Sequence, residues 1–160
     1  AITGLFIKGD VKEDALDQSI LIGGHVILCG YGAFGRTVSE ELDRSVIEHV
    51  IVTNNTEAFV KAKESGKTVV FGDPADRGLL ERLQIKKAMS VVIALDDFDE
   101  VKHTSAAITL LDQDINVIAK VPSEEESLEL AEFNHEYLID GNSLTATMLV
   151  EQVNKSRLLT

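Results

Sequence analysis

Three glycines stand at a spacing that could hold phosphate groups against the polypeptide backbone: Gly30, Gly32 and Gly35, in the hexapeptide GYGAFG. The hexapeptide follows the apolar run HVILC and precedes a segment with helical periodicity. In this setting the first glycine permits a tight turn, the second lets the backbone approach a pyrophosphate, and the third lets helix and strand pack closely. The first N–H groups of the helix then attract the anion. The pattern favours nucleotide binding over a turn kept only for packing.

The end of the second apolar run is where such sites usually carry an acid that binds the ribose hydroxyls. This sequence has Thr53 there, followed by Asn54 and Asn55. Thr and Asn side chains can also hydrogen-bond a ribose, but more weakly than a carboxylate does. Alternatively, Asn55 or Thr56 serves as the N-cap of the next helix. The sequence therefore favours an adenine nucleotide in general and weakens the case for NAD.

Two acidic turns follow later apolar runs, in FGDPAD and ALDD. In the first, Asp73 or Asp76 is placed to cap the following helix. In the second, Asp96 and Asp97 form either an acid pair for catalysis or metal binding, or an N-cap with first-turn charge. We favour the capping role, because negative charge stabilises a helix N-terminus. We assign no residue as a metal ligand.

No other residue pattern points to catalysis. The histidines lie apart from one another, and neither a G-x-S-x-G nor a G-x-x-x-x-G-K-[ST] motif occurs. Cys29 falls inside a predicted strand, where a thiol is a poor nucleophile. An NAD(P)-dependent oxidoreductase is the alternative, but it would need a proton donor near the nicotinamide, and few residues remain to build that pocket. We therefore do not expect an enzyme.

The composition sets further limits. The chain has 160 residues, a length that suits one domain, and 27 acids against 15 bases give a formal net charge of −12. This charge disfavours binding to nucleic acid or to anionic lipid. No apolar run approaches the roughly 20 residues that span a bilayer. A single cysteine excludes an internal disulfide and fits a reducing cytoplasm.

Short apolar runs alternate with helical patterns from His25 onward, as in a parallel sheet with crossover helices. The predicted strands are His25–Cys29, His49–Val52, Thr68–Phe71, Ser90–Leu95, Asn116–Val121 and Tyr137–Ile139. The first predicted helix has an apolar stripe at Phe34, Val38 and Leu42 that would face the sheet. Further helices are predicted at Glu57–Glu64, Asp76–Gln84, Glu100–Leu111, Ser123–Phe133 and Ser143–Arg157. We predict an α/β fold: a Rossmann-like, doubly wound, parallel six-stranded sheet with helices on both faces. Residues 1–24 are predicted to be a linker, with one helical turn around Glu13–Gln18.

The sequence resembles the nucleotide-binding lobe of regulator-of-potassium-conductance (RCK) domains, also called TrkA-N or KTN domains. The resemblance covers about residues 25–158 and rests on four segments in one order, HVILCGYGAFG, IVTNN, FGDPADRGLLERLQI and MSVVIALDDFDE. The G-D-x-x-D segment is the most discriminating of these. Asn134-His135-Glu136 replaces the family's usual glycine-containing turn, and Thr53 replaces an acid that many members carry. The second difference again weakens the case for NAD.

The resemblance implies a site, a role, and a membrane domain upstream of the linker at residues 1–24. Such domains bind NAD(H), AMP, ADP or ATP and regulate potassium channels, uptake systems or Kef-type potassium/proton antiporters from the cytoplasmic side of the plasma membrane. By motif, phosphates would lie on the glycine loop, and ribose and adenine on the turns after the next strands. The implied binding residues are Gly30, Tyr31, Gly32, Ala33, Phe34, Gly35, Thr53, Asn54, Asn55, Asp73, Pro74, Ala75, Ala94, Leu95, Asp96 and Lys120.

The last predicted helix has more apolar positions than one surface stripe requires, at Leu144, Met148, Leu149, Val150 and Val153. The resemblance implies that this helix crosses to a second subunit, giving a homodimer or a larger ring. Alternatively, the helix packs on its own sheet. We divide the rest of the chain into a nucleotide-binding lobe at 25–141 and a dimerisation helix at 142–160. A potassium channel is slightly favoured over an antiporter as the regulated protein.

Overall fold

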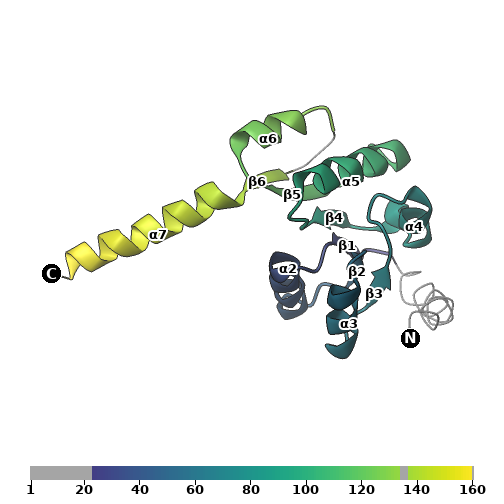
Figure 1. The fold of residues 1–160 in the computed structure, drawn as a ribbon, viewed down its shortest axis with the longest axis horizontal. Coiled ribbons are helices and arrows are strands. Elements are labelled where there is room, and N and C mark those ends of the chain that lie inside the picture. The colour runs from purple at the N-terminus through teal and green to yellow at the C-terminus, as the bar shows by residue number, and fades with distance from the viewer. Residues whose placement is uncertain (1–22, 134–136, 160) are drawn as a thin grey trace.

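The computed structural model describes residues 23–133 and 137–159, in which parallel strands alternate with helices (Figure 1). The strands are β1 (Val26–Cys29), β2 (His49–Thr53), β3 (Val69–Phe71), β4 (Ser90–Ile93), β5 (Val117–Val121) and β6 (Tyr137–Asp140). The helices are α2 (Ala33–Arg44), α3 (Thr56–Glu64), α4 (Arg77–Arg82), the 3₁₀ turn η1 (Ile85–Lys87), α5 (Phe98–Leu111), α6 (Glu124–Glu129) and α7 (Gly141–Leu158). Most of the predicted linker, its helical turn at Glu13–Gln18 and the turn at 134–136 lie outside the described residues.

All six strands join one sheet in the order β3-β2-β1-β4-β5-β6, and every neighbouring pair is parallel. Leu28 in the middle of β1 lies opposite Ile51 of β2 and Val92 of β4. From β1 the chain adds β2 and then β3 on one side. It then returns to place β4 on the other side of β1 and adds β5 and β6 beyond it. Where the order reverses, the crossover connections leave on opposite faces and a crevice opens at the carboxyl ends of the strands. The predicted doubly wound fold is confirmed.

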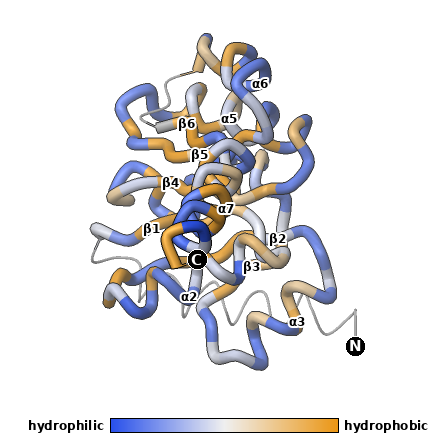
Figure 2. The backbone as a smooth tube through the Cα atoms, turned by 90° about the vertical axis from the view of Figure 1, so that its left-hand side faces the viewer, coloured by the Kyte–Doolittle hydropathy of each residue, from blue (hydrophilic) through white to orange (hydrophobic). Residues whose placement is uncertain are grey.

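The strands are buried because helices pack on both faces of the sheet. One apolar cluster contains Ile27, Val91 and Val117 and is closed by Leu80 of α4 and Ile108 of α5. The other contains the opposite-facing side chains of the same sheet and is closed by α3 and α2; its buried members are Leu28, Tyr31, Ile51, Phe59, Ala62, Val69 and Ala94. In Figure 2 hydrophobic residues follow the strands, whereas hydrophilic and hydrophobic residues alternate along the helices around them. A central strand covered on both faces explains the continuous apolar run before the glycine loop.

One face of the sheet is less covered over β5 and β6 than elsewhere. The cluster beneath α2 and α3 reaches Val92 on β4 and does not extend onto β5 or β6. There Ile118 and Lys120 are half-buried and Ile139 is 43% exposed. These side chains follow the alternation of their strands toward the face that α2 and α3 cover elsewhere. The part of this face that β5 and β6 form is therefore open.

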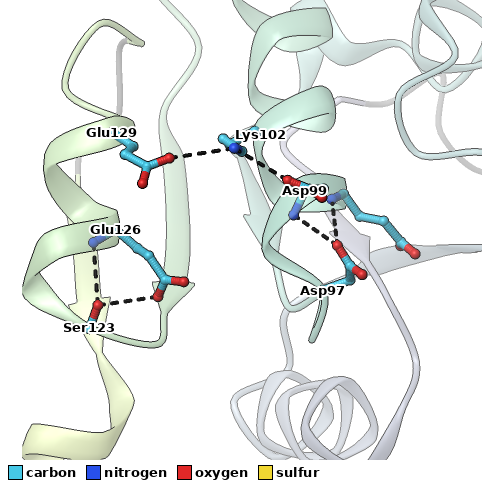
Figure 3. Close-up of polar contacts among 7 residues, drawn as sticks. Asp97, Asp99, Lys102, Ser123, Glu126 and Glu129 are labelled. Atoms are coloured by element: carbon cyan, nitrogen blue, oxygen red, sulfur yellow. Dashed lines mark hydrogen bonds and ion pairs between the residues drawn. The ribbon is translucent and has the colours of Figure 1, made fainter.

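Side-chain caps decide where most helices begin. Each capping oxygen accepts a hydrogen bond from a first-turn N–H, which has no partner within the helix. The capping residues are Asn55 for α3, Asp76 for α4, Asp97 for α5, Ser123 for α6 and Asp140 for α7. Figure 3 shows two of them, Asp97 and Ser123. The caps confirm Asn55 over Thr56, Asp76 over Asp73, and the capping role of the ALDD turn.

Several predicted boundaries were wrong. Helix α4 ends early because Gln84 adopts a left-handed conformation with φ of 58°, and a 3₁₀ turn follows. Helix α6 ends at Glu129 and not at Phe133, whereas α7 begins at Gly141, because Asp140 caps it. The predicted stripe on α2 was wrong at one position. Phe34 is 37% exposed, while Val38 and Leu42 do pack on the core, beside the buried Ser39.

Helix α7 extends away from the sheet as an isolated arm (Figure 1). None of its residues is buried. Its large apolar side chains are each more than half exposed, including Leu144, Met148, Leu149, Val150 and Val153. Within residues 23–133 and 137–159, no helix has both the length and the hydrophobicity to cross a membrane. The helix does not pack on its own sheet, which was one of the two expectations for it.

Candidate functional site

The glycine loop has a geometry that only glycine permits at two positions. Gly30 has a φ of 103°, and a Cβ there would stand 2.6 Å from the carbonyl oxygen of Ala94. A Cβ on Gly35 would stand 2.2 Å from the carbonyl oxygen of Gly30. Because both contacts are with backbone, side-chain motion cannot relieve them. The first glycine therefore makes the tight turn, and the third lets α2 pack directly on the loop, as the spacing predicts.

The N-terminus of α2 is open. Gly32 is its N-cap and supplies no side-chain hydrogen bond, whereas every other α-helix in the described part of the chain has a side-chain cap. No acid occupies the first turn of α2, where the basic residue Arg36 lies. The first-turn N–H groups and the positive end of the helix dipole are thus left to attract an anion.

A cleft of about 450 Å³ lies against this N-terminus, at the carboxyl ends of β1, β2 and β4. Its position is the crevice that the reversal in strand order creates. Ten of the sixteen predicted binding residues line it: Gly30, Tyr31, Gly32, Ala33, Thr53, Asn54, Asn55, Ala94, Leu95 and Asp96. The structure thus brings together the glycine loop and the ends of β2 and β4, which are far apart in the sequence.

Thr53 takes the place of the usual ribose-binding acid and is almost fully buried, with 4% of its surface exposed. Its hydroxyl oxygen accepts a hydrogen bond from the N–H of Asn55 at 3.1 Å. The side-chain oxygen of Asn55 in turn accepts from the N–H of Ala58 at 2.8 Å. The hydroxyl of Thr53 keeps its own hydrogen for donation. Its chemistry differs from that of a carboxylate, which accepts two hydrogen bonds from a ribose diol.

The cleft also contains residues that the sequence analysis did not assign to it. They are Arg36, Glu57, Ala58, Lys61, Asp97 and Glu100. Arg36 directly follows the glycine motif, so its position on the first helical turn was a signal that could have found it. The ammonium group of Lys61 forms an ion pair with the Glu57 carboxylate at 3.0 Å, one helical turn away, and this carboxylate offsets part of its positive charge. Arg36 is therefore the stronger candidate for a phosphate contact.

Phe34 and Lys120 lie in a neighbouring hollow of about 290 Å³, which shares Leu95 and Asp96 with the main cleft. The ammonium nitrogen of Lys120 lies 4.1 Å from the centre of the Phe34 ring and 4.0 Å from a carboxylate oxygen of Asp96. Helix α7 contributes Gly141 to the same hollow. This second hollow extends the site toward β5 and α7.

The remaining predicted residues do not line the cleft. Asp73, Pro74 and Ala75 form the turn between β3 and α4, where the carboxylate of Asp73 accepts a hydrogen bond from the N–H of Ala75 at 2.9 Å. Pro74 is buried, and Ala75 packs on the core. Gly35 acts through packing, as described above. Contact between these residues and a ligand stays a prediction.

The groups that could act as nucleophiles or metal ligands lie elsewhere. Burial raises the pKa of the Cys29 thiol to about 12, so the thiolate is not formed near neutral pH. A separate hollow of about 380 Å³ at the amino ends of the strands contains His25 and His49, whose rings hydrogen-bond to Leu83 and to Ser39 respectively. Within residues 23–133 and 137–159, no group of three or more His, Cys, Asp or Glu side chains could hold a metal ion.

The chain is similar to domains of potassium transport proteins. It is 24% identical over 126 residues to potassium channel protein 1 of Methanocaldococcus jannaschii, which covers 74% of this chain and 38% of that protein. It is 20% identical over 129 residues to the glutathione-regulated potassium-efflux system protein of Haemophilus influenzae, which covers 81% of this chain and 21% of that protein. The chain thus spans a minor part of each curated relative.

Solved structures share the fold. The TrkA-N domain of inner membrane protein ybaL from Escherichia coli matches with a TM-score of 0.74, at 22% identity over 81% of this chain and 96% of that one. The GsuK channel bound to NAD matches at 0.67, with 24% identity, 73% of this chain and 21% of that one. The AMP-bound Kef C-terminal domain of Shewanella denitrificans matches at 0.67, with 20% identity, 81% of this chain and 79% of that one. The TrkA-N domain family model matches residues 26–139, which include the whole glycine loop and cleft, and the chain therefore belongs to the TrkA-N domain family.

Proposed function

We propose that this chain is a nucleotide-sensing regulatory domain of a potassium transport protein. The observation that carries the proposal is the uncapped N-terminus of α2, which opens into a cleft of about 450 Å³ at the strand-order reversal of a TrkA-N domain. Binding of a nucleotide in this cleft shifts the domain between two conformations. The attached channel or antiporter responds, because a ligand moves such an equilibrium by binding one conformation better than the other.

The ligand is an adenine nucleotide: AMP, ADP, ATP, NAD⁺ or NADH. The α-phosphate or pyrophosphate lies on the N–H groups around Gly32, and Arg36 supplies a cation at the same helical turn. The ribose hydroxyls contact Thr53 and Asn54 at the end of β2. The GsuK channel bound to NAD and the AMP-bound Kef C-terminal domain have similar folds, which supports both a dinucleotide and a mononucleotide as ligand of this chain. The neutral Thr53 favours the mononucleotides.

Regulation without turnover fits the residues of the cleft. Its described lining contains no histidine or cysteine, and the one cysteine of the chain is buried with a raised pKa. Tyr31, which belongs to the glycine loop, is buried, with 5% of its surface exposed. A hydride-transfer enzyme would need a proton donor that reaches its substrate. We infer that the nucleotide acts as a signal and is not consumed.

The apolar arm α7 supports a homodimer or a larger ring. A helix with six large apolar side chains more than half exposed, Leu158 among them, is unfavourable in water, because their burial would release ordered solvent. A second copy of the same chain supplies both a matching helix and the open sheet face around Ile118 and Ile139. We infer that the domain lies on the cytoplasmic side of the plasma membrane, attached to the transport protein it regulates. Both a channel and an antiporter remain candidates for that protein.

The test is a thermal-unfolding titration of the purified chain with AMP, ADP, ATP, NAD⁺ and NADH. A ligand that binds only the folded state raises the Tm, by an amount that grows with ligand concentration. The expected result is an increase with at least one of these nucleotides and none with inorganic phosphate at equal concentration. If no nucleotide raises the Tm, the proposal is wrong. NADH oxidation at a catalytic rate with an added acceptor would instead support an oxidoreductase.

A further inference from the structure

Lys120 on β5 contacts three elements that surround the candidate site. Its ammonium nitrogen lies beside the Phe34 ring on the first turn of α2 and beside Asp96 in the turn after β4. Its Cγ and Cδ lie 3.3 and 3.2 Å from the point where a Cβ on Gly141 would stand. Gly141 is the first residue of α7. A single side chain therefore connects the glycine loop with the helix that leaves the sheet.

The contacts of the ammonium group are weak enough to be replaced. The Lys120 side chain is 29% exposed and that of Asp96 is 74% exposed, so water and salt screen the pair. Their separation of 4.0 Å exceeds the length of a hydrogen bond. A phosphate group carries more charge than a carboxylate and accepts short, charge-assisted hydrogen bonds. An anion at the N-terminus of α2, at the same turn as Phe34, therefore competes for the ammonium group.

The contact of the aliphatic stem is close. The stem of Lys120 occupies space beside Gly141 that a larger residue would fill, so movement of the stem changes the surroundings of the first turn of α7. Little else holds this helix to the sheet: it has no buried residue, and Asn142 donates one hydrogen bond to the carbonyl oxygen of Pro122 at 3.1 Å. Since 18 residues form a helix of roughly 27 Å, a small rotation at Gly141 becomes a large displacement at its far end.

We propose that Lys120 transmits the occupancy of the cleft to α7. The anionic part of the bound nucleotide draws the ammonium group away from Phe34 and Asp96, and the displaced stem changes the direction in which α7 leaves the sheet. The inference rests on the proposed function, because it takes a nucleotide as the ligand. It adds the residue through which that ligand acts on the helix proposed to join two subunits.

The experiment measures the position of α7 directly. Cysteines replacing two exposed residues, His103 on α5 and Gln152 on α7, carry spin labels, and Cys29 stays unlabelled because it is buried and its thiol pKa is raised to about 12. Doubly labelled subunits are diluted into an excess of unlabelled chain, so that only distances within one subunit are recorded. Distance distributions are compared without ligand and with saturating AMP, ADP, ATP or NAD⁺. Tm is measured on the same samples to establish occupancy.

Lys120→Met keeps the stem and removes the ammonium group. Nucleotides should still raise its Tm at saturating concentration, with reduced affinity, because the variant loses the Lys120–phosphate contact but keeps the open N–H groups of α2 and Arg36. The nucleotide-dependent change in distance should disappear. Lys102→Met is the matched control: the Lys102 ammonium also lies near a ring, 5.1 Å from the centre of Phe98, and bridges Asp99 to Glu129 (Figure 3), but away from Gly141. This control should keep the full change.

A second variant, Gly141→Ala, tests the stem contact if Lys120→Met does not fold. The added Cβ would press on the Lys120 stem at 3.2 Å, and the backbone at Gly141 is compatible with alanine. Its ligand-free distance distribution should already differ from that of the wild type. An unaltered distribution would overturn the inference.

The outcomes separate the two proposals. If no nucleotide raises the wild-type Tm, the proposed function is wrong and the inference falls with it. If nucleotides bind but the distance between the two labels does not change, the inferred role of Lys120 is wrong while the proposed function stands. The same holds if the distance changes in Lys120→Met as it does in the wild type. Loss of the change in Lys120→Met alone supports the role of Lys120.

Discussion

Gly35 packs so closely on Gly30 that a Cβ on the helix residue would stand 2.2 Å from the carbonyl oxygen of the loop residue. This contact sets the distance between the first turn of α2 and the end of β1. The open N–H groups of the helix are thereby placed at the mouth of the crevice. The nucleotide site thus depends on a backbone contact within a span of six residues.

Gly35→Ala should lower the free energy of unfolding by at least about 1–3 kcal/mol, as overpacking of a rigid site does. The cost is large because the clash is with backbone and cannot be relieved by rotating a side chain. Urea unfolding at pH 7.5 measures the change. A loss below about 0.5 kcal/mol, the size of an ordinary surface substitution, would contradict the close packing.

Gly32→Ser should separate folding from ligand binding. Serine is a good N-cap, so the ligand-free protein should be at least as stable as the wild type. The added hydroxyl competes with phosphate for the N–H groups of α2, and nucleotide affinity should fall about tenfold or more, as expected when a charge-assisted hydrogen bond is lost. Calorimetric titration and urea unfolding give the two quantities. Unchanged affinity would show that phosphate does not lie at this N-terminus.

Arg36→Gln should weaken the binding of each nucleotide, and the loss of affinity should grow with the charge of its phosphate groups. The guanidinium lies on the first turn of α2 and lines the cleft, so ATP and ADP should lose more affinity than AMP. The wild-type affinity for ATP should also fall more steeply with salt than that of the variant. Lys63→Gln, on α3 outside the cleft lining, is the control. Equal losses for all three nucleotides would show that Arg36 does not contact the β- or γ-phosphate.

His25 should make stability depend on pH below neutrality. Burial lowers the pKa of this imidazole below its usual 6.5, and Nδ1 has no hydrogen-bond partner in the described structure. The unfolded state therefore binds the proton more tightly than the folded state does. Stability is intact above pH 6.5 and falls as the pH drops from there toward the folded pKa, with a slope of at most about 1.4 kcal/mol per pH unit. His25→Gln keeps a donor for Leu83 and should remove this component from urea-unfolding curves recorded between pH 8 and 5.5. Identical pH dependence in both proteins would be evidence against it.

Val150→Asp should disperse a dimer formed by α7. The valine is 58% exposed in one chain, so the charge costs little in the monomer but is desolvated between two subunits. Sedimentation should show a dimer dissociation constant at least tenfold higher, with nucleotide binding retained, and Gln152→Asp controls for added charge on the same helix. A dimer of unchanged affinity would refute helix exchange.

Much of the fold was predictable because its signals are local. The apolar runs, the helical spacing and the caps Asn55, Asp76 and Asp97 each depend on residues a few positions apart, and the structure confirms them. The glycine spacing likewise located the turn at Gly30 and the helix contact at Gly35. The predicted end of α4 was wrong because Gln84 adopts a left-handed backbone conformation, which the spacing of apolar residues does not indicate.

The sequence by itself determined the strand–helix alternation, the glycine loop and the absence of an acid at Thr53. Only the tertiary structure decided which side chains meet across the crevice. Strand order places β5 beside β4, and this brings Lys120 to Phe34 and Gly141, while Asp73 stays at β3, outside the cleft lining. It also left α7 without a core to pack on. These outcomes depend on the pairing and twist of distant strands, which residue spacing along the chain does not encode.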